Sequence, residues 1–117
     1  MKFMVSLITD GTGMEGMTPK ERQEAGEQMM AFMGEIQEAG VLADPGAALG
    51  PSSDARTLRR KSGKVVVTDG PFAESKEQIA GYMVLECKDL DEATGWVEKL
   101  PVRGGAIEVR PIAERPG

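Results

Sequence analysis

Two segments of this sequence are apolar on both of the faces that a β-strand presents. In residues 2–9, Phe3 points to one side and Met4 to the other, and apolar side chains continue on both sides. Residues 79–88 repeat this two-sided pattern. A strand with apolar side chains on both faces is covered on both faces in the folded protein. This requirement constrains the fold more than any other feature of the chain.

The sequence also predicts two helices that could supply such cover. Thr18 can cap the first helix, Glu21 completes a capping box, and Gly40 is placed to end it. The second helix is expected within residues 89–101, between an aspartate cap and a proline. Apolar residues recur at helical spacing in both: Ala25, Met29, Phe32, Met33 and Ile36 in the first, Leu90, Ala93, Val97 and Leu100 in the second.

The remaining segments favour strands. A brief strand is expected at residues 47–49, a β-hairpin at residues 57–67, and a last strand at residues 106–112. The order indicates an α+β sandwich, with two helices on one face of a mainly antiparallel sheet and an extra β-hairpin. Two helices cover only one face of the sheet. We therefore expect a homodimer in which the open sheet faces of two copies meet.

Composition excludes several classes of function. The length of 117 residues favours a single domain, and the net charge of -5 argues against a nucleic-acid partner. The chain contains no histidine, so the usual general base and the usual zinc ligand are missing. Cys87 is the single cysteine and is expected to be a small buried hydrophobe. We expect neither a metal site nor a cofactor.

The first residues are apolar, but this run ends at Thr9, below the length of a signal peptide. A membrane-spanning segment is not apparent in the sequence either. We therefore expect a cytoplasmic protein without a membrane partner.

Residues 11–16 match the dinucleotide-binding pattern G-x-G-x-x-G, after a strand and before a helix. In that motif the helix N-terminus faces the pyrophosphate, so the last glycines lie within the first helical turn. Here Thr18 and Pro19 begin the helix after the third glycine. This spacing favours a flexible glycine turn over a nucleotide site.

The stretch T-D-G-P-F-A-E-S-K-E, residues 68–77, connects two strands. Asp69 and Gly70 are typical turn residues, and a solvated turn accounts for the charges that follow them. The alternative is a site in which Asp69, Glu74 or Glu77 acts as a general base and Lys76 or a nearby arginine holds an anion. Both interpretations remain open at this point.

A second group of polar residues is expected on one sheet face. By parity along their strands, Tyr82, Glu86, Glu108 and Arg110 share the face opposite the helices with Ser6. In a dimer these side chains would line the cleft between the sheets, or they would simply form a partly polar interface.

The D-G-P-F run of residues 69–72 also carries a family resemblance. Together with Gly81-Tyr82, the helix start at residues 89–93 and the segment 107–111, it resembles the YCII-related family, and within it the branch of DGPF-domain proteins. The resemblance extends over nearly the whole chain. It implies a ferredoxin-like sandwich in the dimeric α/β-barrel superfamily, which dimerises through the open sheet face.

The resemblance implies less about function. Most such relatives are uncharacterised, some accompany sigma factors of the extracytoplasmic-function class, and a few are small-molecule enzymes, including a dehydrochlorinase with a proposed His-Asp pair. Asp69 stands at the aspartate of the motif. Because this chain has no histidine, a His-Asp mechanism is excluded here.

Three hypotheses follow. The first is a small dimeric protein that binds a polar or anionic molecule near the D-G-P-F loop, through Pro71, Phe72, Lys76, Glu77, Tyr82 and Arg110. The second is a lyase, isomerase or dehydrochlorinase-like enzyme for a cyclic molecule, with Asp69 or Glu74 as the base and Lys76 or Arg110 stabilising negative charge. The third is a protein-interaction accessory to sigma-factor regulation.

Overall fold

The computed structural model describes residues 1–11, 16–102 and 104–114. The helices and strands of these residues follow one another as β1 (Lys2–Thr9), α1 (Pro19–Glu38), β2 (Leu42–Ala48), β3 (Arg56–Lys61), β4 (Lys64–Asp69), β5 (Gln78–Glu86), α2 (Leu90–Val97) and β6 (Ala106–Pro111). A short 3-10 helix, Ser52–Asp54, precedes β3. Residues 12–15, the centre of the glycine pattern, lie outside the described residues.

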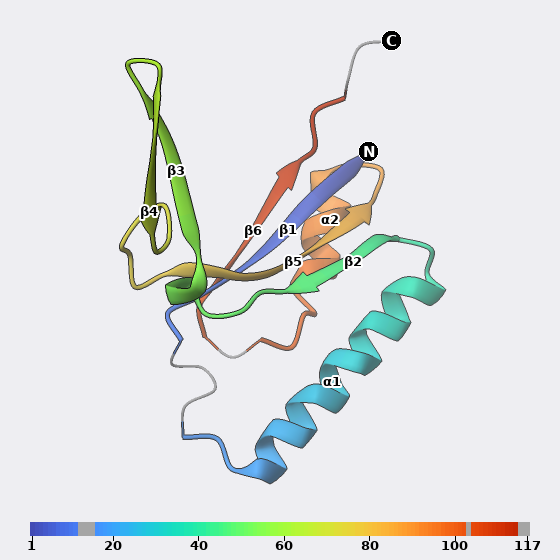
Figure 1. Ribbon diagram of the computed structural model, residues 1–117. Helices are drawn as coiled ribbons and strands as arrows, with labels where there is room; N and C mark the ends of the chain where they lie inside the picture. Colours follow the sequence, from blue (N-terminus) through green and yellow to red (C-terminus); the bar gives the residue numbers. More distant parts are fainter. Residues whose placement is uncertain (12–15, 103, 115–117) are drawn as a thin grey trace.

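Four strands form the main sheet, in the order β2-β5-β1-β6 (Figure 1). β1 lies in the middle and pairs antiparallel with β5 on one side and β6 on the other, and β2 pairs antiparallel with β5. The prediction of an α+β fold with two helices and a mainly antiparallel sheet is therefore confirmed.

The core lies on one face of this sheet. Phe3, Ile36 and Leu85 are fully buried there, and they belong to β1, α1 and β5 respectively. α2 adds Ala93 and Val97 to the same cluster. Both helices thus pack on the face that carries Phe3, as expected. Burying each large apolar side chain stabilises the fold by about 1.5–3 kcal/mol.

Local hydrogen bonds define the start of α1. The Glu21 N–H donates to the Thr18 Oγ1 at 3.1 Å, and the Thr18 N–H donates to the Glu21 Oε1 at 3.3 Å. This is the reciprocal capping box that the sequence predicts. Gly40 follows the helix with a φ of 76°, as expected for a glycine at a helix end.

β2 is longer than the strand expected at residues 47–49, because it begins at Leu42. Pro45 lies within it, and a proline is tolerated on a strand at the edge of a sheet. The register against β5 shifts on both sides of Asp44. The sequence prediction missed this segment because an irregular edge strand lacks regular alternation.

β3 and β4 form a separate two-stranded sheet, as the hairpin prediction required. We call residues 56–69 the arm. It projects from one end of the main sheet, away from both helices (Figure 1). Among the described residues, neither helix is long and apolar enough to cross a membrane.

Candidate functional site

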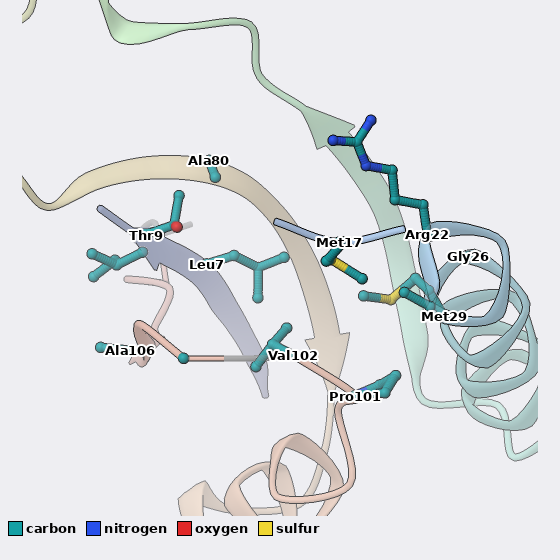
Figure 2. A pocket seen from close by; sticks show the side chains of 13 residues that line it. Leu7, Thr9, Met17, Arg22, Gly26, Met29, Ala80, Pro101, Val102 and Ala106 are labelled. Carbon is teal, nitrogen blue, oxygen red and sulfur yellow. The ribbon is translucent and has the colours of Figure 1, made fainter. Parts of the chain in front are cut away.

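A cavity of about 360 Å³ lies between the first half of α1 and one end of the main sheet (Figure 2). We call it the α1 cavity. β1 contributes Leu7, Ile8 and Thr9, while β5 contributes Ala80. Met17, Ala25, Gly26 and Met29 come from the helix side, and Pro101, Val102 and Ala106 come from the segment after α2. Four separate parts of the chain therefore enclose this space.

The side chains of α1 explain why the space is open. In its second half, Phe32 and Ile36 are buried against the sheet and fill the interface. In its first half, Ala25 and Gly26 replace such large side chains. The Met29 side chain extends toward the sheet, and Leu7 faces it from β1 (Figure 2). Small residues on the helix therefore leave room that the sheet does not fill.

The walls of the α1 cavity are mainly apolar, and its polar side chains lie toward the rim. Thr9 accepts a hydrogen bond from the Gly11 N–H through Oγ1, at 3.1 Å. Arg22 is the charged side chain among the described lining residues, and its guanidinium extends away from the apolar side chains (Figure 2). The cavity is therefore suited to an apolar group, with a positive charge near its opening.

The sequence did not predict this cavity. Ala25 and Met29 belong to the apolar stripe predicted for the helix, and both are half-buried. The available signal was the change along the stripe from Ala25 and Gly26 to Phe32 and Ile36. That change shows where the helix carries small side chains, but it does not show where the strands on the other side of the cavity lie.

The D-G-P-F loop lies at the base of the arm. Asp69 Oδ1 forms an exposed ion pair with Arg56 Nε at 3.2 Å. Pro71 is half-buried, and the Phe72 side chain is 77% exposed. Arg59 stacks over the Phe72 ring at 5.3 Å and donates to the Phe72 carbonyl oxygen at 2.7 Å. Arginines of the arm therefore hold both ends of this motif.

The charged residues after the motif are solvent-exposed. Glu74, Lys76 and Glu77 have exposed side chains. The Gln78 side chain bridges back across this segment, since its Nε2 donates to the carbonyl oxygens of Ala73 and Ser75 at 2.7 and 2.9 Å. These contacts shape a turn, and they leave the three charges in water.

Tyr82 and Arg110 lie elsewhere, on the open face of the main sheet. The register places Tyr82 beside Ser6 and Ser6 beside Glu108, so that these three residues form one row across β5, β1 and β6. Arg110 Nη2 forms an ion pair with Glu108 Oε1 at 2.7 Å. The predicted sharing of this face is confirmed. The predicted site residues nevertheless divide between the arm loop and the open face.

None of these eight predicted residues is among the described residues that line the α1 cavity. Among the described residues there is also no group of three or more cysteine, aspartate or glutamate side chains placed to hold a metal ion. The α1 cavity is thus the strongest candidate site, on the basis of shape and lining.

Two comparisons relate the chain to known proteins. The family model of the YCII-related domain matches residues 1–115. An uncharacterized protein of Rhizobium meliloti (strain 1021) is 40% identical over 106 residues, which cover 85% of each chain.

Proposed function

This chain belongs to the YCII-related family, and from that premise we propose that it binds a small molecule in the α1 cavity. The observation that carries the proposal is the cavity itself, with its volume of about 360 Å³ and its apolar lining. Ligand pockets have volumes of about 300–1,000 Å³ and mainly apolar walls with few polar groups. The ligand is therefore a compact molecule with a mainly apolar body.

The rim adds a charge preference. Arg22 contributes a positively charged guanidinium to the lining of the cavity. An anionic group on the ligand, directed at the opening, would lie near this charge. Carboxylate side chains are absent from the described lining residues, so the cavity offers no general base of that kind. The lining therefore favours binding over catalysis.

The test is a titration followed by amide chemical shifts, with two probes that differ only in their polar group. Cyclohexanecarboxylate and cyclohexylmethanol share an apolar ring, and only the first is anionic. We expect both to shift amides at Leu7, Met29 and Ala80, and the carboxylate to bind more tightly. Arg22→Gln should remove that difference between the two probes.

Two glycines of α1 supply a matched pair of variants. An added Cβ meets no atom within 4 Å at either Gly26 or Gly34, and only Gly26 is among the lining residues. Each replacement by leucine favours the helix by about the same amount, up to 1 kcal/mol. Gly26→Leu should fill the α1 cavity and abolish the shifts, whereas Gly34→Leu should leave them unchanged. Equal binding by both variants would exclude this cavity as the site.

The same titration tests whether the residues predicted around the D-G-P-F loop contact the ligand. We propose that Asp69, Pro71, Phe72, Glu74, Lys76 and Glu77 contribute to binding only if the probes also shift amides of residues 69–77, among which Pro71 has no N–H of its own. Shifts confined to this loop, with none at Leu7 or Met29, would move the site to the arm. The enzyme hypothesis would then regain Asp69 and Glu74 as its candidate bases.

We further propose that two copies pair through their open sheet faces. Tyr82 and Val84 are half-buried on this face, and Met4 is 38% exposed. Ser6 lies in the middle of the face and is 5% exposed. A sheet face with apolar side chains and no helix over it suits a two-fold contact, in which every contact between two different residues occurs twice.

Sedimentation equilibrium tests this pairing. Val84→Glu would place two carboxylates in the contact and should weaken the dimer by at least about tenfold. Met30→Glu is the matched control, because Met30 lies on α1 and is 76% exposed. A protein that remains monomeric at high concentration would contradict the pairing.

A further inference from the structure

The arm is a two-stranded sheet that stands apart from the core. Its strands pair with each other from Arg56 opposite Asp69 to Lys61 opposite Lys64. The described hydrogen bonds that anchor it lie at its base: the Gly70 N–H donates to the Ala55 carbonyl oxygen at 2.7 Å, and the Thr57 Oγ1 donates to the Gly70 carbonyl oxygen at 2.8 Å. A hairpin of two strands is only marginally stable by itself in water.

One face of the arm carries three exposed aliphatic side chains beside one arginine. Leu58 pairs with Val67 and Arg60 with Val65, so alternation places these four residues on the same face. Leu58 is 63% exposed, Val67 55% and Val65 46%. Such a row of large aliphatic side chains on an isolated hairpin loses stability in water and gains it when covered. The arm therefore has the composition of a contact surface.

The shape of the whole chain shows that the arm is not packed against the rest of its own chain. Its radius of gyration is 16.6 Å, and its extents are 49 × 48 × 18 Å. A compact chain of this length has a radius of gyration of about 13 Å. The molecule is thus a thin plate with a projecting arm, and the arm lies far from the core of its own chain.

Charge indicates what covers the arm. Residues 56–64 contain five lysines and arginines and no aspartate or glutamate, so they carry a charge of +5. Because the chain has a net charge of -5, its remaining residues carry -10. Two of the five cations are engaged within the chain, Arg56 with Asp69 and Arg59 with Phe72. The acidic body of a second copy is the complementary surface that is always present with the arm.

We propose that the arm of each copy lies against the body of a second copy, with the face of Leu58, Val65 and Val67 covered and its cations near carboxylates. In a two-fold dimer this contact occurs twice, since each copy supplies one arm and one acidic body. The proposal requires that two copies associate, but it depends neither on the sheet-face contact proposed above nor on the ligand. It adds a second contact surface to the sheet face.

Sedimentation equilibrium at low and high salt separates the two surfaces. The double variant Leu58→Ser with Val67→Ser and the single variant Arg60→Glu should each weaken the dimer by about tenfold or more. Lys20→Glu, the same charge change on α1, should leave the dissociation constant unchanged. Added salt should weaken the wild-type dimer, and it should weaken the Arg60→Glu dimer less.

The outcomes distinguish the two proposals. If Val84→Glu weakens the dimer and the arm variants do not, the sheet pairing stands and the arm proposal is wrong. If the arm variants alone weaken it, the arm proposal stands and the sheet pairing is wrong. A protein that is monomeric at every concentration overturns both.

A second measurement does not depend on how the substituted hairpin folds. A nitroxide is attached to Ser62→Cys, at the tip of the arm, in a chain without isotope label. This chain is mixed with an equal amount of unmodified chain that is labelled with nitrogen-15. Cys87 is buried, so the label reacts at position 62. We expect broadened amides outside residues 54–70 of the second chain. The absence of such broadening under conditions where the protein is a dimer would overturn the proposal.

Discussion

At the scale of single residues, Cys87 illustrates how burial decides chemistry. It follows β5 and is 4% exposed, and its N–H donates to the Met1 carbonyl oxygen at 2.9 Å. Burial, and then the neighbouring Glu92 carboxylate, raise the pKa of its thiol to about 11 from an ordinary value of 9.0. The thiolate is the reactive form, so this cysteine is protected from oxidants and alkylating agents.

The raised pKa predicts how stability depends on pH. Between about 9 and 11 the unfolded chain loses the thiol proton while the folded chain retains it. The unfolded state is then favoured, so the contribution of Cys87 to the free energy of unfolding is constant below pH 9 and declines above it. Denaturant titrations of wild type and Cys87→Ala should show a difference in unfolding free energy that shrinks as the pH rises through this window. A difference that grows instead would contradict the raised pKa.

At the scale of elements, β2 depends on one glycine. Gly46 has a φ of 66°, and its N–H donates to the Asp44 Oδ1 at 2.7 Å. A Cβ at this position would overlap the carbonyl oxygen of Tyr82. The irregular register of β2 thus brings the backbone of Gly46 against β5 more closely than a side chain allows.

We therefore expect Gly46→Ala to destabilise the protein by about 2 kcal/mol or more. Alanine disfavours the positive φ of this position, and its Cβ prevents the close approach of the backbone to β5. Gly50→Ala is the control, since an added Cβ there meets no atom within 4 Å. It should change the free energy of unfolding by no more than about 0.5 kcal/mol. Thermal or urea unfolding measures both, and equal effects would mean that β2 relaxes around the substitution.

The capping box makes a separate prediction for α1. Thr18→Ala removes the acceptor for the Glu21 N–H and should cost about 1 kcal/mol of stability. Thr18→Ser keeps that acceptor and should retain most of the stability. Urea unfolding of the three proteins checks the order. A serine variant as unstable as the alanine variant would show that the threonine methyl group, and not the hydrogen bond, matters here.

At the scale of the whole molecule, one core joins both helices to the sheet. Ile36 of α1 is fully buried in the same cluster as Val97 of α2, and Trp96 packs against that cluster. A shared core predicts that the helices and the sheet unfold together.

Ile36→Ala should therefore destabilise the whole fold by about 2–5 kcal/mol, and not α1 alone. Fluorescence of Trp96, the single tryptophan, and far-ultraviolet circular dichroism should report the same urea midpoint. Gln37→Ala, at the exposed neighbouring position, should leave that midpoint nearly unchanged. Two different midpoints for Ile36→Ala would show that α1 detaches separately.

Local sequence patterns predicted both helices, most of the strands and the family, but not the first part of β2. Thr18 and Glu21 are three residues apart, and the stripe that contains Phe32 and Ile36 repeats every three or four residues. Such signals arise from contacts within one or two turns of chain, so they can be seen without the fold. The same holds for the hairpin and for the D-G-P-F run, which is continuous in the chain.

The position of the candidate site depends on tertiary packing. The α1 cavity exists because Leu7, Met29, Ala80 and Val102 surround one space, although they come from distant parts of the chain. The predicted site residues were divided in the same way, since Asp69 meets Arg56 on the arm while Arg110 meets Glu108 on the sheet. Volume and proximity of this kind depend on how far helices, strands and arm stand from one another, and local sequence patterns carry no information about those distances.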